Sequence, residues 1–139
     1  MPRKDLYHDV VKTALEKDGC RIVKEDLPIS SGGINFFVDI EAEAMYVAER
    51  EGEQIAVEVK TFQGQSLVQN MHEAFGKYIL YRYAIVAERP ELNLFLAIPL
   101  KAYNTFFQLD FIKNVITKDK VNLIVYDTEN QIISKWLIH

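Results

Sequence analysis

An acidic residue and a lysine share one face of a predicted strand. Residues 55–62 read IAVEVKTF, and this alternation puts Val57 and Val59 on one face and Glu58 with Lys60 on the other. Carboxylates are ligands that Mg²⁺ and Mn²⁺ prefer. A lysine two residues from such a ligand can orient or help deprotonate a water for in-line attack on a phosphodiester. The pattern therefore predicts a metal-dependent site at Glu58 and Lys60.

Two further carboxylates complete this candidate site. Asp39 lies in the first arm of a predicted hairpin whose second arm carries Glu58, so both can ligate one ion, with the carbonyl of Val59 as a further ligand. Asp9, on the first predicted helix, can reach the ion directly or through water. The alternative is a solvated face, because opposite charges are common on the exposed side of an antiparallel sheet.

The elements that position these residues follow from apolar periodicity and turn signals. Residues 5–18 have the spacing of an amphipathic helix, residues 29–35 are typical of a loop, and Ser66 with Gln69 forms a capping box that begins a long helix ending before Pro90. The other predicted elements are a strand at 20–27, a hairpin of 35–50 with 54–62, a strand at 92–99, one helix or two short helices at 100–116, and strands at 121–127 and 131–138.

Composition limits the class of protein. The 139 residues are 49% hydrophobic, which predicts one packed α/β domain spanning residues 1–139 around a mixed sheet. A single cysteine and no run of roughly 20 apolar residues predict a cytoplasmic protein outside the membrane. Because the net charge is −4, DNA binding would need a local basic patch, for which Lys60, Lys77, Arg82 and Lys101 are the candidates.

The order of elements resembles the PD-(D/E)xK nuclease superfamily, whose restriction-endonuclease-like core runs helix, three strands, helix, strand. The resemblance covers roughly residues 6–99. It assigns the aspartate of the motif to Asp39 and the E-x-K to Glu58, Val59 and Lys60. It implies a catalytic role for Asp39, Glu58 and Lys60, with Asp9 as the acidic residue of the first helix, and Mg²⁺ or Mn²⁺ as cofactor.

The chain is similar over nearly its whole length to the XisH family, the fdxN element excision controlling factors of cyanobacteria. The similarity rests on FVDIEAE, IAVEVKTF, EAFGKYILYR, AIPLKAYNTFFQLDFI and LIVYD. It implies a cytosolic protein that acts with an XisI-like partner in excision of a DNA element by a separate recombinase. Where related proteins often carry a glutamine on the long helix, this chain has Lys77, which with Arg82 is a candidate phosphate contact.

The alternative to a nuclease is a catalytically inactive regulatory protein that acts through protein interactions. We expect self-association or binding of the XisI-like partner through the region from Phe106 to Phe111 or through the C-terminal strands. Three phenylalanines in that region exceed what a small domain readily buries, and exposed aromatic residues indicate an interface.

Overall fold

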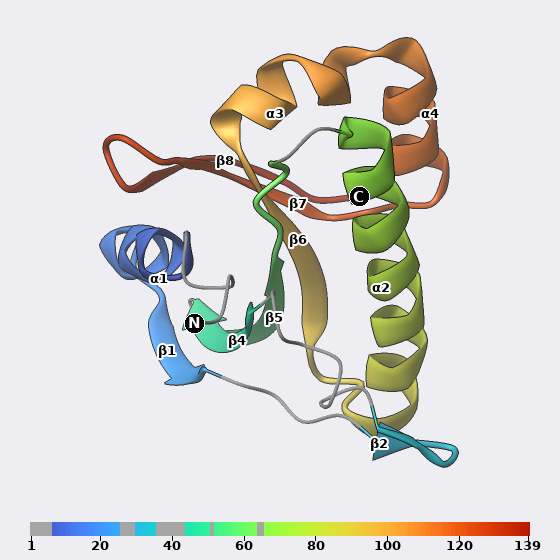
Figure 1. Ribbon diagram of the computed structural model, residues 1–139. Coiled ribbons are helices and arrows are strands. Elements are labelled where there is room, and N and C mark those ends of the chain that lie inside the picture. The colour runs from blue at the N-terminus through green and yellow to red at the C-terminus, as the bar shows by residue number, and fades with distance from the viewer. Residues whose placement is uncertain (1–6, 26–29, 36–43, 51, 64–65) are drawn as a thin grey trace.

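A six-stranded mixed sheet forms the centre of the fold (Figure 1). The computed structural model describes residues 7–25, 30–35, 44–50, 52–63 and 66–139. The strand order is β1-β4-β5-β6-β7-β8, in which β5, β6 and β7 are parallel and the outer pairs are antiparallel. The strands are β1 (Arg21–Lys24), β4 (Ala44–Arg50), β5 (Glu53–Val59), β6 (Asn93–Pro99), β7 (Leu123–Asp127) and β8 (Ile132–Leu137).

The predicted hairpin is formed by β4 and β5. The chain reverses at Gly52, whose φ of +84° lies in the left-handed region that favours glycine. The register pairs Arg50 with Glu53 and Met45 with Glu58. On its other side β5 pairs in parallel with β6, so that Glu58 stands beside Leu96. The strand of the E-x-K motif therefore lies inside the sheet.

The long helix α2 (Leu67–Glu88) covers one face of the sheet. Ser66 caps it, because its hydroxyl accepts a hydrogen bond from the main-chain N–H of Gln69 at 3.1 Å. The helix ends before Pro90, as predicted. Its buried residues are Met71, Ala74, Tyr78, Tyr81, Ala84 and Ile85.

The first helix, α1 (His8–Lys17), covers the opposite face of the sheet. Its buried residues Val11 and Leu15 pack in one cluster with Val57 and Val59 of β5. The sheet thus separates two apolar clusters, one under each helix. This arrangement confirms the predicted α/β fold.

The segment after β6 is broken into α3 (Leu100–Asn104), a 3₁₀ turn η3 (Phe106–Gln108) and α4 (Asp110–Lys118). Phe106 and Phe107 are buried and pack against Phe62 at the end of β5, whereas Phe111 is 74% exposed. The prediction of an exposed aromatic surface is therefore wrong for Phe106 and Phe107, because both side chains pack in the core beyond the carboxyl end of β5.

The segment predicted as a loop at 29–35 contains a small hairpin, β2 (Ser30–Ser31) and β3 (Ile34–Asn35). Gly32 and Gly33 both have positive φ, +56° and +91°, which suits the twist of a two-residue hairpin turn. The hairpin lies beside the C-terminal half of α2 (Figure 1). Among the described residues, no helix has the length and apolar character needed to cross a bilayer.

Candidate functional site

Glu58 and Lys60 share the face of β5 that α2 covers. Alternation along the strand turns Val57 and Val59 toward α1 and Glu58 and Lys60 toward α2, as predicted. This face is buried rather than wet, because Glu58 is 1% exposed and Lys60 is 5% exposed. Burial of a carboxylate and an ammonium group inside an apolar sheet is costly, so the pair marks a candidate site.

Lys60 forms an ion pair with Glu73 of α2. The Lys60 Nζ lies 2.9 Å from Glu73 Oε1, and the lysine side chain is 6% exposed while that of the glutamate is 49% exposed. The hydrogen bond and the charge of Lys60 lower the pKa of Glu73, with smaller contributions from Gln69 and Lys77. α2 therefore presents a charge partner to the lysine of the motif.

Sequence reasoning missed Glu73. It selected Lys77 as the residue of the long helix that faces the site, whereas the contact to Lys60 comes one helical turn earlier. The signal was present, because Gln69, Glu73 and Lys77 are spaced four residues apart and lie on one side of α2. The charge of Lys77 makes a small contribution to lowering the pKa of Glu73.

The main chain at Lys60 is held from two strands. Its N–H donates to the carbonyl of Ala97 in β6 at 3.0 Å. Its carbonyl accepts a hydrogen bond from the buried Tyr126 hydroxyl of β7 at 3.1 Å. Two residues later Phe62 has a φ of +52°, a conformation that non-glycine residues seldom adopt and that is frequent near functional sites. β5 thus ends at a sharp, well-anchored bend.

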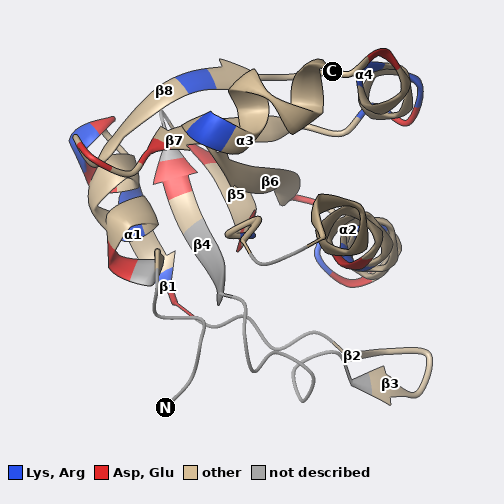
Figure 2. Ribbon diagram, turned by 45° about the horizontal axis from the view of Figure 1, so that its top comes forward, with Lys and Arg blue, Asp and Glu red and all other residues tan. Residues whose placement is uncertain are grey.

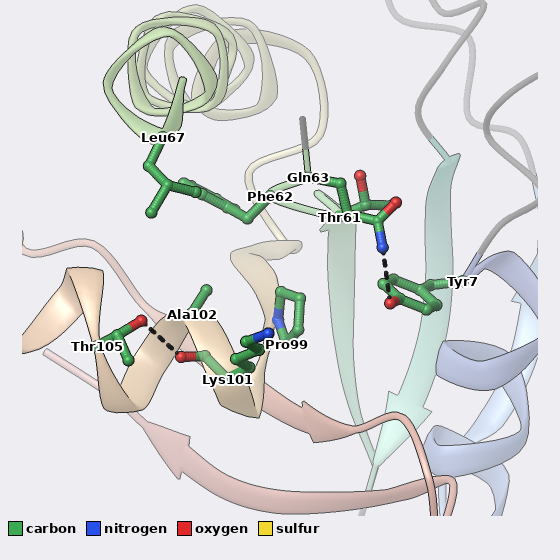
Figure 3. Close-up of a pocket in the computed structure, with 9 residues that line it drawn as sticks. All are labelled: Tyr7, Thr61, Phe62, Gln63, Leu67, Pro99, Lys101, Ala102 and Thr105. Carbon is green, nitrogen blue, oxygen red and sulfur yellow. Dashed lines mark hydrogen bonds between the residues drawn. The ribbon is translucent and has the colours of Figure 1, made fainter. Parts of the chain in front are cut away.

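A cleft of about 610 Å³ opens beyond this bend (Figure 3). It lies where β5 and β6 end and α2 and α3 begin, and ligands of open α/β sheets commonly bind at the carboxyl ends of the strands. The Gln63 side-chain amide donates to the Tyr7 hydroxyl at 2.9 Å across one wall. The lining residues are Tyr7, Thr61, Phe62, Gln63, Leu67, Pro99, Lys101, Ala102 and Thr105.

Asp9 belongs to the helix on the face of the sheet opposite to Glu58 and Lys60. It is exposed on α1, the helix that packs on the opposite face of the sheet. In a helix, two residues correspond to about 200° of rotation, so Asp9 points away from its buried neighbour Val11. Among the described residues of the N-terminal region, Tyr7, at the start of α1, lines the cleft.

Asp39 lies outside the described residues. Among the described residues, no group of three or more His, Cys, Asp or Glu side chains is arranged to hold a metal ion. A buried carboxylate, Glu58, is nevertheless the kind of donor that Mg²⁺ and Mn²⁺ take. The roles of Asp39 and of the Val59 carbonyl as ligands stay predictions.

Arg82 has an intramolecular partner. Its guanidinium donates to the main-chain carbonyl of Asp119 at 2.7 Å and to the carboxylate of the same residue at 3.1 Å. It also lies 5.4 Å from the centre of the Tyr78 ring. These contacts tie α2 to the end of α4, so the predicted phosphate contact has a structural role as well.

Comparisons with known proteins agree on one family. The family model described as XisH protein matches residues 1–134. A crystal structure of a fdxN element excision controlling factor protein from Anabaena variabilis is 46% identical, with a TM-score of 0.88, over 96% of this chain and 98% of the other.

A second crystal structure, of an XisH family protein from Nostoc punctiforme, is also 46% identical, with a TM-score of 0.87, over 96% of this chain and 99% of the other. No curated protein matched the chain. The match of the family model over nearly the whole length, together with these two likenesses, shows that the chain belongs to the XisH family.

Proposed function

We propose that this chain controls excision of a DNA element of the fdxN type and does so through a metal-dependent endonuclease site at the end of β5. The name of the Anabaena relative supports the role in excision. The observation that carries the site is the burial of Glu58 and Lys60 side by side on a central strand, directly before a cleft. The order α1, β1, β4, β5, α2, β6, with the separate β2–β3 hairpin as an insertion, also supports likeness to the PD-(D/E)xK core that the sequence resembles.

The residues of the proposed site have separate roles. Glu58 and Asp39, with the Val59 carbonyl, would hold Mg²⁺ or Mn²⁺. The cation, when bound, would supply positive charge against a phosphodiester. Lys60 orients the attacking water, and Glu73 holds the ammonium group of Lys60 in place. Asp9 is left out of this site because α1 lies on the other face of the sheet.

The cleft beyond Lys60 suits a strand of DNA. The Thr61 hydroxyl, the second N–H of the Gln63 amide and the ammonium group of Lys101 are donors for phosphate oxygens, whereas the Thr105 hydroxyl donates to the Lys101 carbonyl at 2.8 Å. Because the chain has a net charge of −4, binding depends on such local donors and on the cation. We expect weak binding that falls steeply as salt rises.

A second function is favoured by the pairing of the basic residues. Lys60 forms an ion pair with Glu73 and Arg82 with Asp119, which reduces the positive charge that these two residues can offer to DNA. These pairs suit a catalytically inactive protein that acts by binding an XisI-like partner. In that case Glu58 and Lys60 would be structural remnants of a nuclease site.

The proposed nuclease site is tested by measuring DNA cleavage and the binding of divalent cations. Purified protein, alone and with the XisI-like partner, is incubated with branched and linear DNA in Mg²⁺ or Mn²⁺. Cation binding is measured separately by calorimetry on the wild type, Glu58→Gln and Lys60→Ala. Glu129→Gln, an exposed glutamate in the turn between β7 and β8, and Lys118→Ala at the end of α4 serve as matched controls.

We expect cleavage to be lost in Glu58→Gln and Lys60→Ala, cation binding to be weakened in Glu58→Gln, and both to persist in the controls. If both site variants bind cations as the wild type does and still support excision in cells, the nuclease proposal fails. The interaction role then remains, and it is tested by whether the XisI-like partner binds the wild type.

A further inference from the structure

The side of α2 that faces away from the sheet is unusually apolar. Figure 2 looks nearly along the axis of α2, and the sheet lies to one side of the helix while no described element covers the opposite side. Nine residues fall within an arc of about 120° on this outer side, from the spacing of 100° per residue, and seven remain when the partly buried Ile79 and Gln69, which donates to Glu73, are set aside. We call them the outer stripe: Val68, His72, Gly76, Leu80, Tyr83, Val86 and Ala87.

The outer stripe exposes large apolar side chains and carries no Asp, Glu, Lys or Arg. Val68, Leu80, Tyr83 and Val86 are each more than half exposed, and Tyr83 reaches 73%. The chain as a whole is 26% charged, so seven residues on a solvated helix face would ordinarily include roughly two charged ones. An apolar stripe on a surface helix indicates contact with another protein surface.

Gly76 lies near the middle of the outer stripe. Glycine inside a helix is destabilising relative to alanine, and beyond the adjoining turns of α2 a Cβ added at Gly76 would meet no atom of the described residues within 4 Å. Packing within the chain therefore gives no reason for a glycine at this place. A second helix lying across the outer stripe would give one, because a glycine lets two helix backbones approach closely.

We propose that the outer stripe is the contact between two copies of this chain, with α2 of one copy packed antiparallel on α2 of the other around a two-fold axis near Gly76. Each copy has a net charge of −4, and the outer stripe lets two such chains meet without opposing acidic side chains. This inference does not depend on whether the nuclease site is active.

The area predicts how tightly the copies associate. The 22 residues of α2 span about 33 Å, and a stripe about 10 Å wide covers roughly 330 Å² on each copy, or roughly 700 Å² in total. The neighbouring β2–β3 hairpin, with Ile34 57% exposed, adds to this surface. Interfaces of this size are at the weak end, so we expect a dissociation constant of roughly 1–100 µM.

Sedimentation velocity from about 2 µM to about 200 µM tests the proposal. The wild type is expected to shift from monomer to dimer across this range, and Leu80→Glu and Tyr83→Glu to remain monomeric because each would bury an unpaired carboxylate among apolar side chains of the contact. Phe111→Glu is the matched control, because Phe111 is equally exposed but lies on α4. It is expected to dimerise as the wild type does.

A wild type that stays monomeric at about 200 µM would overturn the proposal. So would a dimer that survives both glutamate variants, or one that is lost in Phe111→Glu alone, since the contact would then lie elsewhere. If the wild type stays monomeric and binds an XisI-like partner through the outer stripe, the proposal of a homodimer is likewise overturned.

The substitution Gly76→Ala distinguishes a dimer in which two α2 helices pack closely at Gly76 from a dimer held by apolar contacts alone. In the monomeric Leu80→Glu background it is expected to raise Tm by about 2–4 °C, because alanine favours the helix and its Cβ enters open space. In the wild-type background it is expected to weaken the dimer several-fold. An unchanged dissociation constant would contradict the proposed helix packing.

Discussion

Replacing Glu73 by glutamine is expected to destabilise the protein, because it removes a charge partner of the buried Lys60. Removing one partner of a fully buried ion pair costs about 3–5 kcal/mol, whereas an exposed pair is worth about 0–1 kcal/mol. Here the Lys60 side chain is 6% exposed and that of Glu73 is 49% exposed. The loss expected for Glu73→Gln is therefore intermediate, about 1–2 kcal/mol, or about 3–6 °C in Tm.

The pH dependence of this loss has a definite sign. Lys60 lowers the pKa of Glu73 from the ordinary 4.5, so the folded state prefers the ionised carboxylate. The stabilisation is therefore complete above pH 4.5 and is lost as pH falls through the lowered pKa. The difference in unfolding free energy between wild type and Glu73→Gln should be largest at neutral pH and should decrease as the pH falls below 4.5.

Urea denaturation at several pH values measures this difference, with Glu88→Gln on the same helix as the control. In a Lys60→Met background, Glu73→Gln should have little further effect, because the partner of the carboxylate is gone. The reasoning is refuted if Glu73→Gln is as stable as wild type at neutral pH, or if its loss is the same in the presence and absence of Lys60.

Three other substitutions test the packing around the site. Tyr78→Phe should cost about 1–2 kcal/mol, because the buried hydroxyl accepts from the N–H of Asn122 at 3.1 Å. Burial raises the pKa of Tyr78 above 10.0, so the protonated hydroxyl stabilises the fold below pH 10.0, and this stabilisation is lost as pH rises through the raised pKa. In alkaline denaturation, the unfolding free energies of wild type and Tyr78→Phe should therefore converge. Phe106→Ala should cost about 3–5 kcal/mol in chemical denaturation, whereas the exposed Phe111→Ala should change stability by less than about 0.5 kcal/mol. Ser66→Ala should cost about 1 kcal/mol and speed amide exchange in the first turn of α2, and unchanged exchange there would contradict the capping role.

The element order and the division of β5 into two faces were predictable from the sequence. Alternation in residues 55–62, the capping box at Ser66 and the glycine at the β4–β5 turn are properties of contiguous residues. Such local signals depend little on the rest of the fold. They placed Glu58 and Lys60 on one face, which the structure confirms.

The partners of these residues were decided by tertiary packing. Which helix covers which face of the sheet depends on contacts distant in sequence, and this choice pairs Lys60 with Glu73 and leaves Asp9 on the opposite side. The same packing buries Phe106 beside Phe62, although a composition rich in aromatic residues suggested a surface. Periodicity identifies the buried side of a helix, but it does not specify the surface against which that side packs.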